Sequence, residues 1–376
     1  MSASFGVALF LWQLIAVTSY IYSVKIVGAL TTSQFWKLPR LYVGPRRGMP
    51  NNLPLRSGSC IPLSPDQTHY LINVMRILKK RKRKQSVHIE GNDDTRDCVR
   101  IFNNSDGEWL AKVEEQEHES PGGSNNSRNR RGGGRLPKVN TGVSLVAQCI
   151  RQLRTQDEDC NEDDRPWILF APLKKQPRMK LMIEKCTELG VGILNPVTSD
   201  RMEGGALMCI QQFDKLELQC IEASEQCERL GVPVLTKELA LTQCDSSKDT
   251  SLWNVRDIVN HWCYDWEDEG EYTTDGKQHS GKRALLICRE RGDTKEDRVR
   301  VVPVLQALHG NQRVAFLVGP EGGWSAEEEK VFDEICSKYS GRGDAPIQCI
   351  SLGSSVLRAE TACMMAVGAW ALVHDS

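Results

Sequence analysis

The stretch that decides the fold reads VAFLVGPEGGWSAEEE and covers residues 314–329. An apolar run typical of a β-strand stops at a Gly/Pro cluster, and Ser325 with Glu328 three residues later has the spacing of a capping box. The pattern therefore predicts a strand, a tight glycine loop and a helix. Continuous apolar runs are typical of buried parallel strands, and ligands in open α/β sheets tend to bind at the carboxyl ends of such strands. Glycines there let the backbone approach a ligand closely.

A second stretch of the same kind lies near the C-terminus. Residues 347–352 predict a strand, residues 353–355 a loop, and residues 356–362 lead into a helix that runs to about His374. Since two glycine-bearing strand ends lie so close in the sequence, we expect both loops to build one pocket.

The second half of the chain alternates between strand and helix patterns. This alternation predicts an α/β domain with a parallel sheet over residues 166–376. A polar, acidic segment interrupts it near 264–282 and is interpreted as an insertion. The other predicted strands are 167–173, 192–197 and 284–288, and the other predicted helices are 178–189, 213–229, 252–262 and 301–308.

The first half reads as a separate domain of short strands, residues 36–165. Residues 63–78 predict a capped helix with Leu71, Val74, Met75 and Leu78 on one face. Turn residues separate the strand patterns that follow, which is typical of a small β-barrel. Residues 114–135 are of low complexity and are interpreted as a disordered insertion. The predicted strands are 87–90, 98–102 and 108–113, and residues 143–153 predict a last strand or a short helix.

The first 35 residues contain a strongly apolar segment, residues 5–30. It is long enough to span a bilayer, and small residues near its end also fit a cleavage site. A cleaved targeting segment is the favoured interpretation, and a retained anchor is the alternative. We expect delivery to an organelle, a plastid or a mitochondrion, with the cytoplasm as the alternative; membrane association is expected only if the segment is retained.

Composition limits the possible functions. The chain has 376 residues and a formal net charge of −1, so two folded domains are expected and nucleic acid is neither required nor excluded. Its 14 cysteines form no Cys-x-x-Cys pair and do not cluster with the 7 histidines, so no metal site is expected. Several lie in apolar patterns and are interpreted as small buried hydrophobic residues in a reducing compartment.

Common nucleotide and hydrolase motifs are missing from the sequence. There is no Walker motif, no Gly-x-Gly-x-x-Gly that opens a βαβ unit, and no Gly-x-Ser-x-Gly elbow. The residue pattern alone therefore indicates an α/β enzyme with a cofactor loop.

The two glycine loops, taken together, carry a more specific signal. LVGPEGG at 317–323 with LGSSVLRAETA at 352–362 resembles the RsmE-type ribosomal RNA uridine-N3 methyltransferases of the SPOUT superfamily. Further motifs with the same resemblance occur in family order: PRLY at 39–42, NVMR at 73–76, KCTELGV at 185–191, SDR at 199–201, and EQCER at 225–229 followed by VP at 232–233.

The resemblance implies an N-terminal PUA-like β-barrel that binds RNA and a C-terminal SPOUT methyltransferase domain with a trefoil knot. It also implies a homodimer that uses S-adenosyl-L-methionine to methylate N3 of a uridine in 16S-type small-subunit rRNA. Cofactor contacts are expected, mainly through the backbone, from Leu317, Val318, Gly319, Pro320, Glu321, Gly322, Leu352, Gly353, Val356 and Leu357. RNA contacts are expected from Arg40, Arg76, Lys175, Arg178 and Arg201.

Two residues are the candidates for catalysis. Arg358 is expected to stabilise the anion that develops at N3 or to position a phosphate. Glu360 could act as a base, could orient Arg358, or could simply place a favourable charge at a helix N-terminus. Glu321 likewise has two candidate roles: it could cap its own loop or bind the cofactor.

Departures from the family pattern leave alternatives open. Ser355 stands where the family usually has arginine, Ala359 where it has threonine, and residues 175–178 keep only the basic ends of a K-G-D-R run. The alternatives are methylation of another RNA position, or an RNA-binding or ribosome-assembly factor that has lost catalysis.

Overall fold

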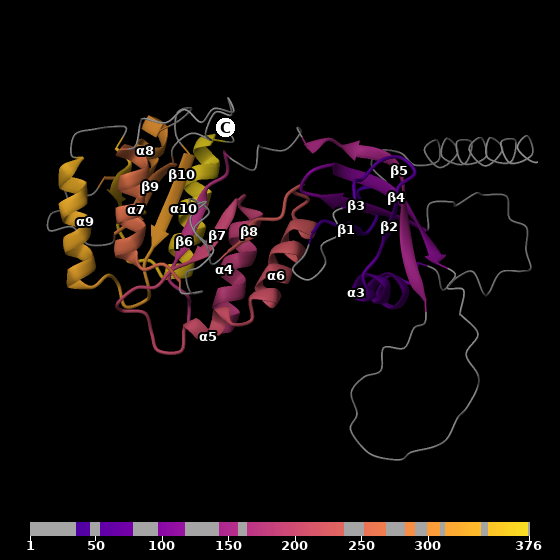
Figure 1. The fold of residues 1–376 in the computed structure, drawn as a ribbon, viewed down its shortest axis with the longest axis horizontal. Helices are drawn as coiled ribbons and strands as arrows, with labels where there is room; N and C mark the ends of the chain where they lie inside the picture. The colour runs from indigo at the N-terminus through magenta and orange to yellow at the C-terminus, as the bar shows by residue number, and fades with distance from the viewer. Residues whose placement is uncertain are drawn as a thin grey trace, which may run out of the picture. The chain divides into compact units, whose positions relative to one another are not determined.

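A computed structural model of the chain describes residues 35–45, 53–77, 97–116, 143–156, 164–236, 252–267, 283–289, 299–308, 313–339 and 345–374. The apolar segment 5–30, the predicted strand 87–90 and most of both predicted insertions lie outside these residues. The chain divides into two compact units, Met1–Glu158 and Asp159–Ser376, which are called unit 1 and unit 2 (Figure 1). Within the described residues, no helix is long and apolar enough to cross a membrane.

Unit 1 is built on a sheet whose described part has five strands in the order β1-β3-β4-β5-β2. The β1–β3 pair is parallel and the other pairs are antiparallel. Inward residues alternate along β5, as expected for a strand with one buried face, so residues 143–153 form a strand rather than a helix. The strands are β1 (Arg40–Tyr42), β2 (Cys60–Pro62), β3 (Cys98–Asn103), β4 (Gly107–Gln116) and β5 (Ser144–Arg154).

The helix of unit 1 begins as predicted but ends differently. Ser64 and Gln67 form a capping box at the start of α3 (Pro65–His69), and a π-helical turn, η1 (Tyr70–Val74), follows. Leu71 is buried, but Val74 is 60% exposed. The predicted apolar face is therefore wrong at Val74 and at the exposed Met75, because a π-turn rotates the following residues away from the 3.6-residue period.

Unit 2 contains the predicted parallel sheet. Its described strands have the order β11-β9-β10-β6-β7-β8, and every pair between them is parallel. All carboxyl ends therefore lie at one edge of the sheet. The strands are β6 (Trp167–Phe170), β7 (Ile193–Pro196), β8 (Val234–Leu235), β9 (Arg283–Cys288), β10 (Arg313–Val318) and β11 (Ile347–Ile350).

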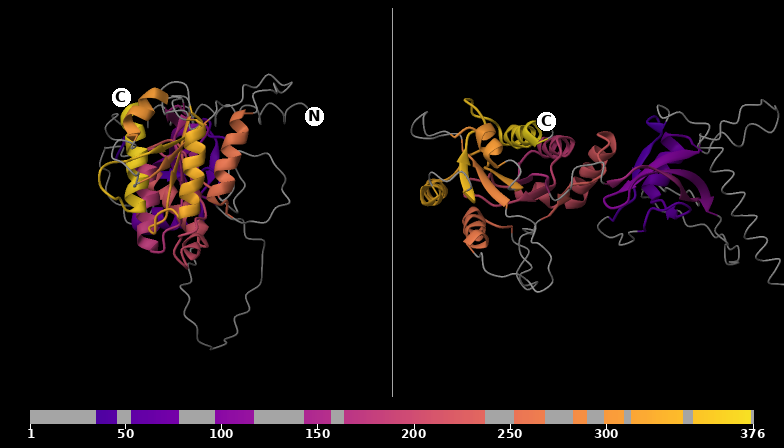
Figure 2. Two further views of the ribbon diagram at one scale, coloured as in Figure 1. Left: turned by 90° about the vertical axis from the view of Figure 1, so that its left-hand side faces the viewer. Right: turned by 90° about the horizontal axis from the view of Figure 1, so that it is seen from above.

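Helices cover both faces of this sheet. Helix α10 packs against α4, α8 and β10, whereas α7 and α9 pack on the opposite face (Figure 2). Two ends differ from the sequence prediction: α6 stops at Gln226 because Glu228 is left-handed (φ 62°), and α7 continues to Glu267 into the predicted insertion. The helices are α4 (Gln176–Glu188), α5 (Leu207–Ile210), α6 (Phe213–Gln226), α7 (Val255–Glu267), α8 (Val301–Leu308), α9 (Ala326–Lys338) and α10 (Ala359–His374).

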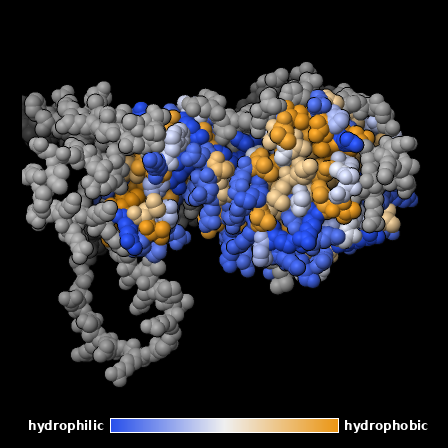
Figure 3. Space-filling model, turned by 180° about the vertical axis from the view of Figure 1, so that it is seen from behind, coloured by the Kyte–Doolittle hydropathy of each residue, from blue (hydrophilic) through white to orange (hydrophobic). Residues whose placement is uncertain are grey.

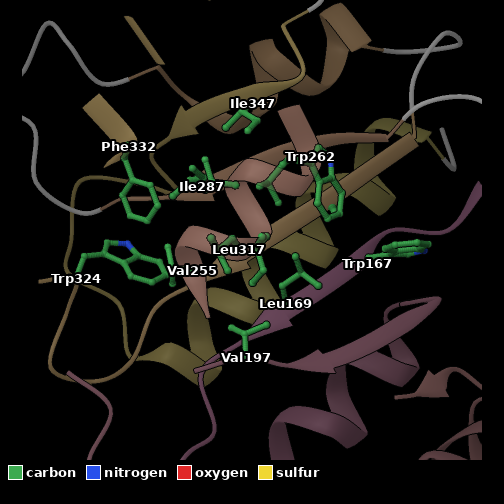
Figure 4. Close-up of a cluster of buried hydrophobic side chains, with 14 residues drawn as sticks. Trp167, Leu169, Val197, Val255, Trp262, Ile287, Leu317, Trp324, Phe332 and Ile347 are labelled. Carbon is green, nitrogen blue, oxygen red and sulfur yellow. The ribbon is translucent and has the colours of Figure 1, made fainter. Parts of the chain in front are cut away.

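The core under α7 and α9 fixes the segment that follows β10. Trp324 lies in this core, where its ring meets Phe332 of α9 edge to face at a centroid distance of 5.1 Å (Figure 4). Its indole N–H donates to the backbone oxygen of Cys288 at 3.1 Å, so the buried nitrogen is satisfied. The glycine loop is thus held between strand β10 and a buried tryptophan.

The chain leaving β11 lies between the two ends of the β9–α8 connection. The amide of Arg289 donates to the oxygen of Ile350 at 2.9 Å. The amide of Ser351 donates to the oxygen of Val299 at 2.8 Å, and its oxygen accepts from the amide of Val301 at 3.2 Å. On the side away from β9, Ser351 is therefore hydrogen-bonded to the residues that lead into α8.

Candidate functional site

The candidate site consists of two loops at the carboxyl edge of the unit 2 sheet, residues 319–323 after β10 and residues 352–358 after β11, which we call the two-loop site. Both follow strands that pair in parallel with β9. The second loop carries half-buried Leu352 and Leu357, and its Gly353 and Val356 are exposed. The site thus combines apolar side chains with the backbone of two strand ends.

Gly319 is required by the protein's own packing. A Cβ at this position would lie 2.8 Å from the Trp324 ring. The sequence-based interpretation, that glycine keeps a side chain away from a ligand, is incomplete here, because Trp324 already occupies that space.

Gly322 is held in the same way by a neighbouring turn. A Cβ there would lie 2.9 Å from the backbone oxygen of Arg201. Asp200 fixes this turn: its carboxylate accepts from the Ser325 hydroxyl at 2.6 Å, and its amide donates to Glu328 at 3.1 Å. The capping box of α9 therefore also anchors the turn at 199–201 beside the glycine loop.

Arg178 of α4 joins the glycine loop to the start of α10, the helix that follows the second loop. Its Nε donates to Oε1 of Glu360 at 2.7 Å, and Nη2 lies 2.6 Å from the same oxygen. Its Nη1 pairs with Glu321 in the glycine loop. The hydrogen bond to Glu360 is the largest cause that raises the pKa of Arg178. One guanidinium thus links three parts of the chain that are far apart in sequence: α4, the first loop and the start of α10.

Glu360, the second residue of α10, is a buried carboxylate. The residue is only 5% exposed, and its Oε2 is buried without a hydrogen-bond partner in the part of the chain that the structure describes. Of the three roles expected for Glu360, its place in the first turn of α10 fits a favourable charge at a helix N-terminus. Its recorded partner is Arg178, which the sequence did not predict, and no pairing with Arg358 is recorded among the described residues.

Arg358 lies at the end of the second loop, immediately before α10. Its side chain is exposed, and its backbone oxygen accepts from the amide of Ala362, which starts the helix. The guanidinium can therefore reach a substrate that approaches the edge of the sheet.

The other predicted RNA contacts fall into two groups. Arg76, Lys175 and Arg201 are exposed and could meet RNA. Arg40 is only 7% exposed, pairs with the buried Glu108 at 2.7 Å and lies 3.6 Å over the Phe102 ring. Its place in the structure is that of a core ion pair of unit 1, which corrects the expectation that it faces RNA.

Sequence reasoning missed two parts of this site. The pairing of Arg178 with both glutamates could not be found, because the three residues are separated by up to 182 positions. The contact of Asp200 with the capping box of α9 could not be found either, because Asp200 and Ser325 lie 125 positions apart in the sequence.

The comparisons with known proteins give the family of the chain. Residues 161–371 match the RNA methyltransferase domain family, so this chain belongs to that family. The sequence is 23% identical over 332 residues to the Ribosomal RNA small subunit methyltransferase E of Rickettsia conorii, covering 88% of this chain and 94% of that protein. The family resemblance inferred from the motifs is thereby confirmed.

Two solved structures have a similar fold. One is a Ribosomal RNA small subunit methyltransferase E from Neisseria gonorrhoeae bound to S-adenosyl methionine: TM-score 0.51, 20% identity, 90% of this chain and 98% of that chain covered. The other is described as a "probable rRNA-methyltransferase" from Porphyromonas gingivalis: TM-score 0.52, 18% identity, 90% and 99% covered. The similarity therefore extends over both units.

Proposed function

We propose that this RNA methyltransferase uses S-adenosyl-L-methionine to methylate N3 of a uridine in 16S-type small-subunit rRNA. The observation that carries the proposal is that Arg178 joins the glycine loop to the start of α10, so that the two sequence motifs meet at one edge of the parallel sheet. The relatives named as ribosomal RNA small subunit methyltransferases, one of them bound to S-adenosyl methionine, support the cofactor and the class of RNA in this proposal.

The residues of the two-loop site fit this cofactor. Arg178, Glu321 and Glu360 together carry a net charge of −1 (one arginine against two glutamates), which suits a cationic ligand. The buried Oε2 of Glu360 can accept a hydrogen bond from the ligand. Leu352 and Leu357 offer apolar surface for an adenine ring, and the strand ends offer backbone groups.

Bound S-adenosyl-L-methionine would supply a methyl group on a positively charged sulfur. The chain's own residues must then deal with the uridine, whose N3–H is only weakly acidic. In this proposal Arg358 stabilises the negative charge that develops as N3 loses its proton, or holds a neighbouring phosphate. Glu360 holds its carboxylate toward Arg178, which fits a positioning role better than that of a base free to take up the proton.

Binding and product analysis test this proposal directly. Titration calorimetry with S-adenosyl-L-methionine should show saturable binding; absence of binding contradicts an enzyme and favours an RNA-binding or assembly factor. Mapping of methylated rRNA bases with and without the protein should show N3-methyluridine only with it. Methylation at another position would contradict the uridine-N3 assignment alone.

Two features of the fold are part of the proposal. The path of Ser351, between Arg289 and Val299–Val301, is the one that a chain threaded through the β9–α8 connection would take, which supports a trefoil knot. The five-stranded sheet of unit 1 supports a PUA-like domain that binds RNA. An experimental structure that follows the chain from residue 289 to 299 tests the knot. If this connection does not pass around the chain at Ser351, the knot is contradicted.

A homodimer is proposed from an apolar face of unit 2. Met365 and Leu372 of α10, with Leu181 of α4 and Val302 of α8, are exposed, and Leu372 is 80% exposed. Figure 3 shows apolar residues gathered on the face of unit 2 opposite to that seen in Figure 1. Exposed apolar patches of this kind mark interaction sites. Sedimentation should give a dimer that Leu372→Glu dissociates and that Val74→Glu, in unit 1, leaves intact.

Delivery to a plastid or mitochondrion through residues 5–30 is also proposed. A fluorescent reporter fused to the first 35 residues should enter the organelle, and diffuse cytoplasmic fluorescence would contradict this.

A further inference from the structure

Two cysteine side chains from different elements of unit 2 meet with an unusually short separation. Sγ of Cys336, in α9, lies 2.8 Å from Sγ of Cys349, in β11. Both are free thiols of intermediate exposure. A disulfide bond is about 2.05 Å long, so closing it would require the sulfurs to approach by less than 1 Å. The pair is thus already close to bonding distance.

An arginine stands beside this pair. Nη1 of Arg289, at the end of β9, lies 3.8 Å from Sγ of Cys349 and 2.8 Å from Asp333 of α9, and Nη2 pairs with Glu329. The pKa of the Cys349 thiol is lowered, first by the hydrogen bond from Cys336 and also by the positive charge of Arg289, while desolvation and Asp333 oppose the shift. Thiolates are the reactive form of cysteine, and a positive neighbour of this kind favours them.

Four buried thiols of unit 2 provide a contrast. Cys186, Cys220, Cys288 and Cys363 are buried, and desolvation raises the pKa of each. They behave as the small buried hydrophobic residues expected from the sequence. The Cys336–Cys349 pair differs because it combines a partner sulfur, partial exposure and a neighbouring guanidinium.

We propose that Cys336 and Cys349 form an oxidative modification site, at which a peroxide converts the two thiols to a disulfide between α9 and β11. The Cys349 thiolate attacks a peroxide oxygen, so that an S–O bond forms, the O–O bond breaks, and hydroxide leaves and takes up a proton to give water. Sγ of Cys336 then attacks the sulfenic sulfur: the S–S bond forms, the S–O bond breaks, and the departing hydroxide leaves with the Cys336 proton as a second water. The sulfurs lose two electrons, which reduce the peroxide.

The position of the bond relates it to the two-loop site. Helix α9 begins directly after the glycine loop, and β11 ends directly before the second loop. A disulfide would therefore link the element after one loop to the element before the other. In a reducing compartment, a small dithiol reductant would reverse it.

The test uses the full chain and hydrogen peroxide. Trypsin cleaves after Lys338 and Arg342, so the cysteines fall into separate peptides, residues 331–338 and 343–358, with one cysteine each. After brief exposure to peroxide, a non-reducing digest should contain these peptides joined, two hydrogens lighter than their sum, and dithiothreitol should separate them. The midpoint of thermal unfolding should rise by a few degrees on oxidation, because the crosslink constrains the unfolded chain.

Three variants make the result specific. Cys336→Ser should stop the crosslink and leave Cys349 oxidised to the sulfenic or sulfinic acid. Arg289→Gln should slow crosslinking several-fold, whereas Cys227→Ser, which removes an exposed thiol at the end of α6, should leave its rate unchanged. The proposal is overturned if wild-type protein is oxidised at Cys227 or Cys60 before any joined peptide forms. None of these measurements depends on methyltransferase activity.

Discussion

Each unit contains an arginine–glutamate cluster, and the two clusters differ in what they join. In unit 1, the fully buried Glu108 accepts from Arg40 at 2.7 Å, Arg100 at 3.4 Å and Arg154 at 2.7 Å. All four residues belong to paired strands of one sheet. In unit 2, Arg178 binds two glutamates that belong to a loop and to a helix start.

The surroundings of the two clusters set their electrostatics. Desolvation is the largest effect on Arg40 and lowers its pKa, although Glu108 opposes the shift. Arg178 remains 22% exposed, and hydrogen bonding to Glu360 raises its pKa. The first cluster therefore holds the strands of one sheet together at a cost in desolvation, whereas the second sets the position of the glycine loop relative to the start of α10. Removing one partner should show this difference, in stability for unit 1 and in ligand affinity for unit 2.

The largest effect is expected from Glu108→Ala. The change leaves three arginines without the buried carboxylate that they share, and breaking a buried ion pair costs about 3–5 kcal/mol of folding stability. Hydrogen exchange at the amides of β3 and β4 should accelerate accordingly. The matched control is Glu114→Ala: Glu114 is exposed, and its ion pair with the partly buried Lys112 contributes less than about 1 kcal/mol. Equal effects for both variants would contradict a structural role for the Glu108 cluster.

Arg358→Ala should have the next largest effect, now on catalysis. Loss of a group that stabilises a developing anion costs about 10²–10³-fold in rate. Methyl transfer to rRNA should fall by that factor while calorimetric binding of S-adenosyl-L-methionine stays within about threefold, since the cofactor groups remain. Lys330→Ala, an exposed cation on α9, serves as the control. A fully active Arg358→Ala enzyme would remove Arg358 from the mechanism.

Arg178→Gln is expected to weaken binding of S-adenosyl-L-methionine about tenfold. A hydrogen bond to a charged group contributes about 1.5–3 kcal/mol, and partial exposure reduces that value. Titration calorimetry measures the change, and Lys185→Gln provides a close control on the same helix, because Lys185 also pairs with two glutamates but lies away from the loops. If RNA affinity falls instead and cofactor affinity does not, Arg178 is an RNA contact, as its sequence motif first indicated.

The smallest effects concern the exposed cations. Arg76→Ala and Lys175→Ala should each weaken RNA binding a few-fold and reduce the slope of log affinity against log salt by about 1, as for loss of one phosphate contact. Arg40→Lys should leave that slope unchanged, because Arg40 is buried. Filter binding at several salt concentrations distinguishes these outcomes, and a reduced slope for Arg40→Lys would contradict the assignment of Arg40 to the core.

The local sequence pattern was sufficient to predict those elements whose signal lies within one short segment. The capping box at Ser325, the strand before Gly319 and the helix 301–308 depend on neighbours a few residues apart, and the structure has them as predicted. The π-turn after His69 and the extension of α7 to Glu267 were not predictable in this way, because packing within each unit can override local periodicity.

The sequence by itself determined the order of strands and helices in unit 2 apart from α5 and β8, the parallel α/β character of that unit, and the RNA methyltransferase family through its two loop motifs. The tertiary structure decided which side chains meet. It buried Arg40 in the core of unit 1, paired Arg178 with Glu321 and Glu360, and brought Cys336 next to Cys349. The physical reason is that strand and helix patterns are properties of neighbouring residues. An ion pair or a sulfur contact, in contrast, depends on distances between distant segments that only the packed sheet and its helices fix.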